Sequence, residues 1–197
     1  MPWLVLVLLA ATFVALLRGG RLANFGDIHL RMWWLLPIGF AIQASSAFLP
    51  ETDWAHTAGL VLVLSSYVPL IIAVGANRDR PGMLLAGLGI LANFTVIAAN
   101  GGMPVMPDAI RAASGFTIDE PSITAAKHVI FDESTRLGFL ADVIPLRIFG
   151  QGHVISLGDV VLAIGLGVFL EGELRKPVRW FKHRAASRSG SGSAHRD

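Results

Sequence analysis

The sequence predicts an all-α, polytopic membrane protein with about five transmembrane helices and an amphipathic helix on its outer face. Just over half of the 197 residues are hydrophobic and 15% are charged, whereas a soluble domain carries about a quarter charged residues. The charged residues are clustered, so long stretches of the chain contain none. A bilayer selects this pattern because a charge buried in hydrocarbon costs several kcal/mol.

Five apolar segments are long enough, or nearly so, to cross a hydrocarbon core of about 30 Å at about 1.5 Å per helical residue. They run over residues 2–17, 32–50, 57–76, 82–100 and 155–170. The first resembles a secretory signal, but its arginines follow the apolar run, so we expect a retained anchor. Trp33, Trp34 and Trp54 fall at predicted membrane interfaces. Gly82 and Ala86 have the spacing of small residues at a close helix contact.

The distribution of lysine and arginine predicts an N-terminus outside the cell and a C-terminus in the cytoplasm. With that orientation most of the sixteen basic residues lie in cytoplasmic segments, and the short outer loop 51–53 has none. Cytoplasmic loops are enriched in Lys and Arg. We therefore expect a single transmembrane domain over residues 1–174, with an outer segment at 101–154, in a bacterial cytoplasmic membrane.

Residues 175–197 are predicted to form a basic, then disordered, cytoplasmic tail. Its basic residues alternate with aromatic ones, which is typical of an anchor at the anionic leaflet. The predicted anchor residues are Arg175, Lys176, Arg179, Trp180, Lys182 and Arg184. No basic face exists elsewhere in the sequence, so we expect anionic lipid headgroups, and no nucleic acid, as partners.

The outer segment is too long for a bare connection and should contain structure. From residue 122 to 144 the apolar residues Ile123, Ile130, Leu137 and Ile144 recur every seven positions. This period predicts an amphipathic helix on the outer membrane face, capped at its start by Ser122. We expect that face to pack against a protein or lipid ligand.

Asn93 and Asn100 lie on one face of the fourth span and are followed by Gly101 and Gly102. One interpretation is a polar binding groove that opens at the outer surface, with glycine backbone available for close approach. In the alternative, Asn93 bonds across helices and Gly101 supplies the left-handed residue after a helix end.

Asp142 and Asp159 are the candidate catalytic residues, because both are expected near the outer membrane surface. Two carboxylates held close together cannot both ionise, so the pair can activate water and protonate a leaving amine. In the alternative interpretation, Ser156 and Asp159 form a capping box at the start of the fifth span, and Asp142 is an exposed loop carboxylate.

The sequence contains no cysteine, which excludes disulfides and iron–sulfur clusters. His128 and Asp132 are one helical turn apart, with His153 nearby, and such residues can bind a metal, but we favour the interpretation of a solvated helix face. We expect no metal and no cofactor.

Three stretches carry a resemblance to a bacterial membrane-protein family: residues 98–105 (AANGGMPV), 127–145 (KHVIFDESTRLGFLADVIP) and 153–165 (HVISLGDVVLAIG). They resemble the signature of the domain of unknown function 5317. This resemblance covers nearly the whole chain except the tail. It implies a membrane location and no particular activity.

A second, local resemblance concerns the last third of the chain. Residues 137–142 and 155–159, followed by an apolar span, are similar to the aspartate-bearing motifs of lipoprotein signal peptidases. That resemblance implies Asp142 and Asp159 as the cleaving pair. Ile155 and Ser156 stand where those enzymes have phenylalanine and asparagine.

Three functions therefore remain open from the sequence. The first is a membrane protein without an assignable activity that packs with a partner or lipid at its outer face. The alternative is an aspartate-dependent intramembrane hydrolase or peptidase. The second alternative is a small-molecule transporter, although the spans show no obvious repeat and lack charge at mid-membrane.

Overall fold

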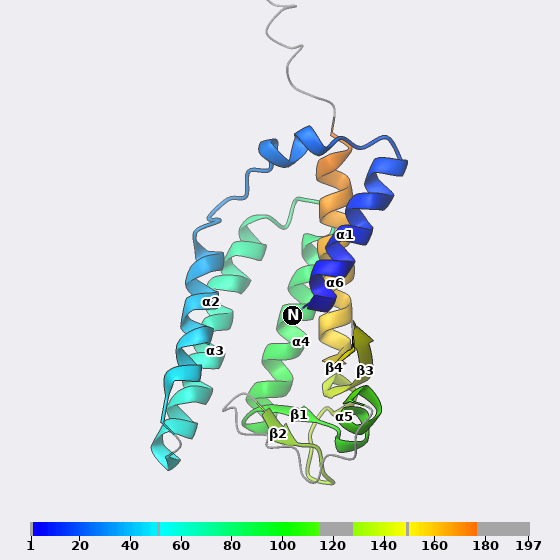
Figure 1. Cartoon of the computed structure of the whole chain (residues 1–197). Coiled ribbons are helices and arrows are strands. Elements are labelled where there is room, and N and C mark those ends of the chain that lie inside the picture. Colours follow the sequence, from blue (N-terminus) through cyan, green and yellow to red (C-terminus); the bar gives the residue numbers. More distant parts are fainter. Residues whose placement is uncertain (1, 51, 115–127, 149, 177–197) are drawn as a thin grey trace, which may run out of the picture.

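The computed structural model describes residues 2–50, 52–114, 128–148 and 150–176, and it shows a row of helices with a small sheet at one end (Figure 1). The five long helices are α1 (Pro2–Leu17), α2 (Leu35–Ser45), α3 (Asp53–Ala76), α4 (Met83–Asn100) and α6 (Leu157–Leu174). Their most extensive mutual contacts place them in the order α2–α3–α4–α6–α1. Each overlaps one of the five predicted apolar segments, so a helix is confirmed in all five, although α3 begins before its predicted segment and α6 ends beyond it.

Within the described residues, two helices are long and apolar enough to cross a membrane, over Trp54–Ala76 and Met83–Asn100. Helices α1 and α2 are apolar but shorter, and a 3-10 helix, η2 (Ser46–Phe48), extends α2. Helix α6 is long, but it has one acidic residue in its first turn and two in its last. These lengths and compositions, above all those of α3 and α4, suggest a membrane protein.

The helix connections gather at two ends of the row (Figure 1). The basic end holds a 3-10 helix, η1 (Leu22–Asp27), the α3–α4 turn and the last turn of α6. The sheet end holds the α2–α3 connection and the small sheet. Figure 1 shows η1 lying across the end of α6, opposite the sheet.

Two buried asparagines fasten the connections at the basic end. Asn24 donates hydrogen bonds to the carbonyl oxygens of Leu174 and Lys176 at 2.8 and 2.7 Å, which satisfies the open C-terminus of α6. Asn77 donates to the carbonyl oxygen of Arg31 at 2.8 Å and accepts from its amide at 2.9 Å. The chain before α2 is therefore tied to the α3–α4 turn.

Helices α4 and α6 approach so closely that their contact requires glycine. A Cβ atom added to Gly165 would lie 2.3 Å from the backbone nitrogen of Ala86, and one added to Gly82 would lie 2.1 Å from the carbonyl oxygen of Gly165. A Cβ atom on Gly89 would lie 2.5 Å from the carbonyl oxygen of Gly158. Small residues allow this backbone approach, as the spacing of Gly82 and Ala86 predicted.

The prediction of a mostly helical fold is confirmed, but the fold is not all-α, because a four-stranded mixed sheet forms at the sheet end. The additional elements are β1 (Met103–Val105), α5 (Pro107–Ser114), β2 (His128–Ile130), the 3-10 helix η3 (Gly138–Leu140), β3 (Asp142–Ile148) and β4 (Gln151–Ser156). The strand order is β2–β1–β3–β4. Strand β1 is parallel to β2 and β3, whereas β3 and β4 are antiparallel. Helix α5 packs against β3 and β4.

The predicted amphipathic helix over residues 122–144 is also wrong. Its described part, residues 128–144, forms β2, a loop, η3 and the start of β3, and the predicted cap Ser122 lies outside the described residues. A seven-residue recurrence fits a helix, but β-branched Ile130 and Ile144 pack equally well in strands. Strand pairing decides the outcome. The pairing of β2 with β1 and of β3 with β4 satisfies the backbone hydrogen-bonding groups of β2 and β3.

Replacement of Gly165 by alanine should destabilise the protein, because the new Cβ would overlap the backbone of α4. Overpacking costs about 1–3 kcal/mol, and we expect the upper end of this range because a backbone cannot yield as a side chain can. The measurement is the thermal unfolding midpoint in detergent. Gly75→Ala in α3 is the matched control, since a Cβ there meets nothing within 4 Å. Equal midpoints for the two variants would contradict the prediction.

Candidate functional site

A cluster of polar side chains lies where α4 and α6 meet the sheet. Asn93 Nδ2 donates to Asp159 Oδ1 at 2.8 Å, and Asn93 Oδ1 accepts from Ser156 Oγ at 2.9 Å. Asn93 and Ser156 are buried, and Asp159 is partly buried. Both ends of the Asn93 amide are therefore paired, which burial among apolar side chains requires. The cross-helix hydrogen bond predicted for Asn93 is confirmed.

Asp159 also caps the start of α6, as its spacing from Ser156 predicted. Its amide donates to Ser156 Oγ at 3.0 Å, and its Oδ2 accepts from the Ser156 amide at 3.4 Å, which together form a capping box. Ser156 is the last residue of β4, so one residue ends the strand and caps the helix. A cap of this kind stabilises a helix by about 1 kcal/mol. Asp159 therefore has a structural role.

Asp142 is buried at the start of β3, so the interpretation of an exposed loop carboxylate is wrong. Only 7% of it is exposed. Its backbone pairs with Val105 of β1 and Ser156 of β4, and its carbonyl oxygen accepts from the amide of Met106 at 3.0 Å. Ser156 thus stands opposite Asp142 in the sheet and bonds to Asp159. The fold brings both aspartates next to the same serine.

Tyr67 belongs to this cluster, and the sequence reasoning missed it. It lies on α3, it is buried, and its ring packs at 59° against Phe94 with 5.8 Å between the ring centroids. Its hydroxyl is within electrostatic range of both Asp159 and Asp142. The available signal was that the one tyrosine of the chain lies inside an apolar span, where a buried hydroxyl needs a polar neighbour.

Asn100 ties the sheet end to the end of α4. Its Nδ2 donates to the carbonyl oxygen of Arg136 at 2.9 Å and its Oδ1 accepts from the Arg136 amide at 2.8 Å. Gly101 ends α4 with a left-handed φ of 71°, as the alternative interpretation predicted, and Gly102 is buried behind it. The amide of Asn100, like that of Asn93, is therefore engaged within the protein.

The residues considered for a metal site, His128, Asp132 and His153, are not brought together as a site. Among the residues that the structure describes, no group of three or more His, Cys, Asp and Glu side chains is placed to hold a metal ion. Asp132 closes a turn, because its Oδ1 accepts from the hydroxyl and the amide of Ser134 at 2.6 and 2.8 Å. These hydrogen bonds lower the pKa of Asp132 below its usual value, and the bond from the Ser134 hydroxyl has the largest effect. His128 lies on β2 and His153 on β4, at opposite edges of the sheet.

Two of the residues that were predicted to anchor the chain to lipid, Arg175 and Lys176, lie at the basic end. Arg175 forms an ion pair with Glu171, and Lys176 forms one with Glu173. The other predicted anchor residues, Arg179, Trp180, Lys182 and Arg184, lie outside the described residues.

Comparisons with known proteins identify relatives of most of the chain. A model described as "Family of unknown function (DUF5317)" matches residues 27–171. An uncharacterized protein of Thermotoga maritima is 30% identical over 165 residues, which cover 83% of this chain and 87% of that protein. A C4-dicarboxylate transport protein of Paracoccus denitrificans is 31% identical over 150 residues, which cover 66% of this chain and 33% of that protein. The chain thus spans about a third of the transport protein. No solved structure matches.

Replacement of Asn100 by alanine should loosen the loop around Arg136, because both hydrogen bonds to the Arg136 backbone are lost. We expect amide hydrogen exchange in that loop to become at least about fivefold faster, the effect of about 1 kcal/mol. The matched control is Thr95→Ala on the same helix, whose hydroxyl bonds only within α4, to the carbonyl oxygen of Leu91. Unchanged exchange in Asn100→Ala would show that the asparagine does not hold the loop.

Proposed function

Since the chain belongs to DUF5317, a family of unknown function, we propose a function from its own geometry. It is a five-span protein of the bacterial cytoplasmic membrane, with its N-terminus outside and its C-terminus inside, and it binds a partner at its outer face. One observation carries the proposal: large apolar side chains are exposed at the sheet end, beyond the apolar helices. They are Ile130, Leu137 and Phe139, which we call the outer apolar patch.

The distribution of charge and tryptophan supports the five spans and their orientation. The basic end collects arginines from the α1–α2 and α3–α4 connections, together with Arg175 directly after α6, and the positive-inside rule assigns such an end to the cytoplasm. Trp33 and Trp34 are exposed near the basic end, and Trp54 is exposed near the sheet end. Tryptophan favours the two membrane–water interfaces, so these positions suit a layer of lipid between the two ends.

The outer apolar patch is held by the polar contacts at the sheet end. Asn100 fixes the backbone of Arg136, next to Leu137, and the Asp132 turn lies just after β2. Large apolar side chains on a fixed surface favour an interaction site, because exposed apolar area on a mobile loop would bind weakly. The partner is therefore expected to bury Phe139, which is 65% exposed.

A second candidate function is an aspartate-dependent hydrolase. The observation that favours it is the placement of Asp142 and Asp159 next to Ser156, with Tyr67 within range of both charges. Two carboxylates within hydrogen-bonding distance of each other can activate water for attack on a peptide bond. The capping box and the bond to Asn93 are compatible with this role, since they would position Asp159.

Transport is a further alternative, and its support is the name of the Paracoccus denitrificans relative. A four-carbon dicarboxylate carries two negative charges and needs cationic groups along its path. The five long helices contain no lysine or arginine within their bounds. The chemistry of the described helices therefore favours the first proposal over transport of a dianion.

The orientation is testable with single cysteines, because the chain contains none. An impermeant maleimide on intact cells should label Phe139→Cys and leave Asp79→Cys unlabelled, since these exposed side chains lie at the sheet end and the basic end. Both should react after the cells are permeabilised. The reverse labelling pattern would overturn the orientation.

The same Phe139→Cys variant tests the partner, because a photoactivatable cross-linker on its thiol reports what covers the outer apolar patch. We expect a discrete protein adduct in intact cells. Arg147→Cys is the control, since Arg147 is exposed on β3 and belongs to no apolar patch. Adducts with lipid alone, or equal protein adducts from both positions, would contradict a protein partner at the patch.

For the hydrolase, Asp142→Asn and Asp159→Asn should each abolish cleavage while the protein remains folded. The measurement is the set of new N-termini in membrane proteins of cells that express each variant, compared with wild type. Asp108→Asn is the control, because Asp108 is an exposed carboxylate of α5. A wild-type set of N-termini retained in either aspartate variant would rule out the pair.

A further inference from the structure

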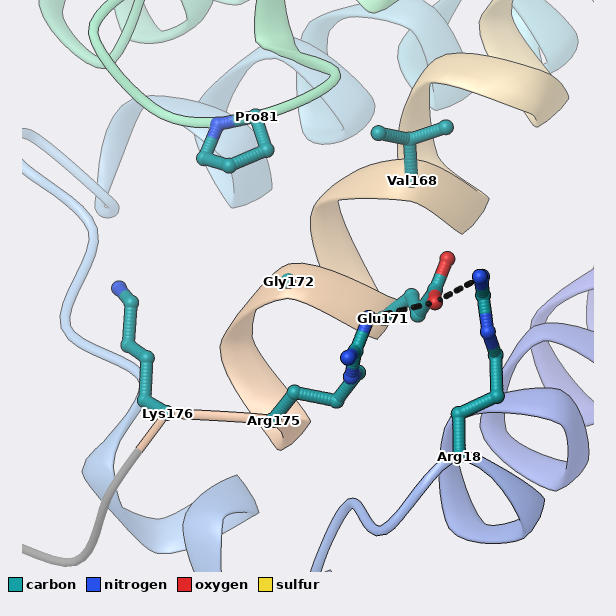
Figure 2. A pocket seen from close by; sticks show the side chains of 7 residues that line it. All are labelled: Arg18, Pro81, Val168, Glu171, Gly172, Arg175 and Lys176. Atoms are coloured by element: carbon teal, nitrogen blue, oxygen red, sulfur yellow. Dashed lines mark hydrogen bonds and ion pairs between the residues drawn. The ribbon is translucent and has the colours of Figure 1, made fainter.

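A cavity of about 490 Å³ opens at the basic end, between the ends of α1 and α6 and the α3–α4 turn (Figure 2). Its basic lining residues are Arg18, Arg175 and Lys176, and its other lining residues are Pro81, Val168, Glu171 and Gly172. Figure 2 shows Arg18 and Arg175 converging on Glu171, while Lys176 lies on the far side of Gly172. We call this cavity the basic pocket.

The cations of the basic pocket outnumber their counterions. Arg18 and Arg175 both pair with Oε1 of Glu171, at 2.6 and 3.4 Å. Lys176 in turn shares Oε1 of buried Glu173 with Arg80, at 2.5 and 3.1 Å. Each carboxylate can neutralise only one of its two cations. Each group of one carboxylate and two cations therefore keeps one net positive charge. Because a guanidinium has five N–H donors, both arginines keep donors for a further anion.

We propose that the basic pocket binds the phosphate of an anionic glycerophospholipid. Arginine binds phosphate with two parallel hydrogen bonds, and basic pockets between membrane helices on the cytoplasmic side bind anionic lipid headgroups. The lining also suits the rest of a lipid. Exposed Val168 lies in the pocket wall and exposed Leu17 precedes Arg18, so acyl chains find apolar surface directly beside the charged group.

Gly172 shapes the pocket floor. A Cβ atom there would lie 3.2 Å from the ring of Pro81, so the bare glycine backbone leaves room between α6 and the α3–α4 turn. The pocket is thus a built feature of three elements, and it lies at the depth where a span gives way to the polar headgroup layer. This inference rests on the proposed membrane location.

The test measures phosphatidylglycerol bound to the full-length protein in phosphatidylcholine mixed micelles, by native mass spectrometry. Each basic residue near a charged headgroup contributes about fivefold in affinity, so Arg18→Gln with Arg175→Gln should weaken binding about 30-fold. The charge-conserving pair Arg18→Lys with Arg175→Lys should bind nearly as wild type. If the double glutamine variant fails to fold, Arg175→Gln alone, expected to bind about fivefold more weakly, carries the test.

Arg31→Gln is the matched control, because Arg31 is an exposed arginine at the same end that does not line the pocket. An equal loss in this variant would overturn the pocket in favour of general charge attraction. Displacement of the lipid by millimolar glycerol phosphate would overturn the lipid as the source of the phosphate. Binding in micelles is independent of orientation and of any outer partner, so inverted cysteine labelling would refute the proposed topology without affecting the pocket.

Discussion

The close approach of α4 to α6 is the constraint on which the rest of the structure depends. Where Gly82, Gly89 and Gly165 lie, backbone meets backbone, and no side chain separates the two helices. In lipid, apolar side chains gain little by leaving the solvent, so close packing and polar contacts must hold helices together. The glycines supply the packing along the helices. The polar groups at the two ends, Asn93 with Asp159 and Arg80 with Glu173, supply the rest.

The two ends use polar groups in different ways. At the sheet end every polar atom of the Asn93 amide has a partner, and the capping box occupies both Ser156 and Asp159. Such a network fixes one arrangement of helix and sheet and leaves little capacity for a ligand. At the basic end two carboxylates are each shared by two cations. That end therefore carries positive charge in excess of its paired carboxylates.

The sequence predicts the elements whose cause is local and fails where partners are distant along the chain. The five helices follow from apolar length, and the capping box at Ser156 follows from its spacing to Asp159. The sheet does not, because β1 pairs with β2 and β3 across long intervening segments, and a short apolar run has no period that distinguishes strand from helix. The burial of Asp142 could not be predicted for the same reason, because it depends on the pairing of β3 with β1 and β4. The excess of basic residues in the segments at the basic end could be counted from the sequence, but their convergence on one pocket could not.

The arrangement of helices in a row explains why so many large apolar side chains are exposed. Helices α3 and α4 each contact two neighbouring helices, so apolar residues such as Val61, Val68 and Leu88 project from the faces between those contacts. In water, apolar surface repeated along whole helices would drive association. In a membrane, lipid tails cover the same apolar surface, so the helices do not need to enclose it in a core. The geometry of the row and the composition of its helices therefore point to the same solvent, which also explains why glycine and asparagine lie at the contact between α4 and α6.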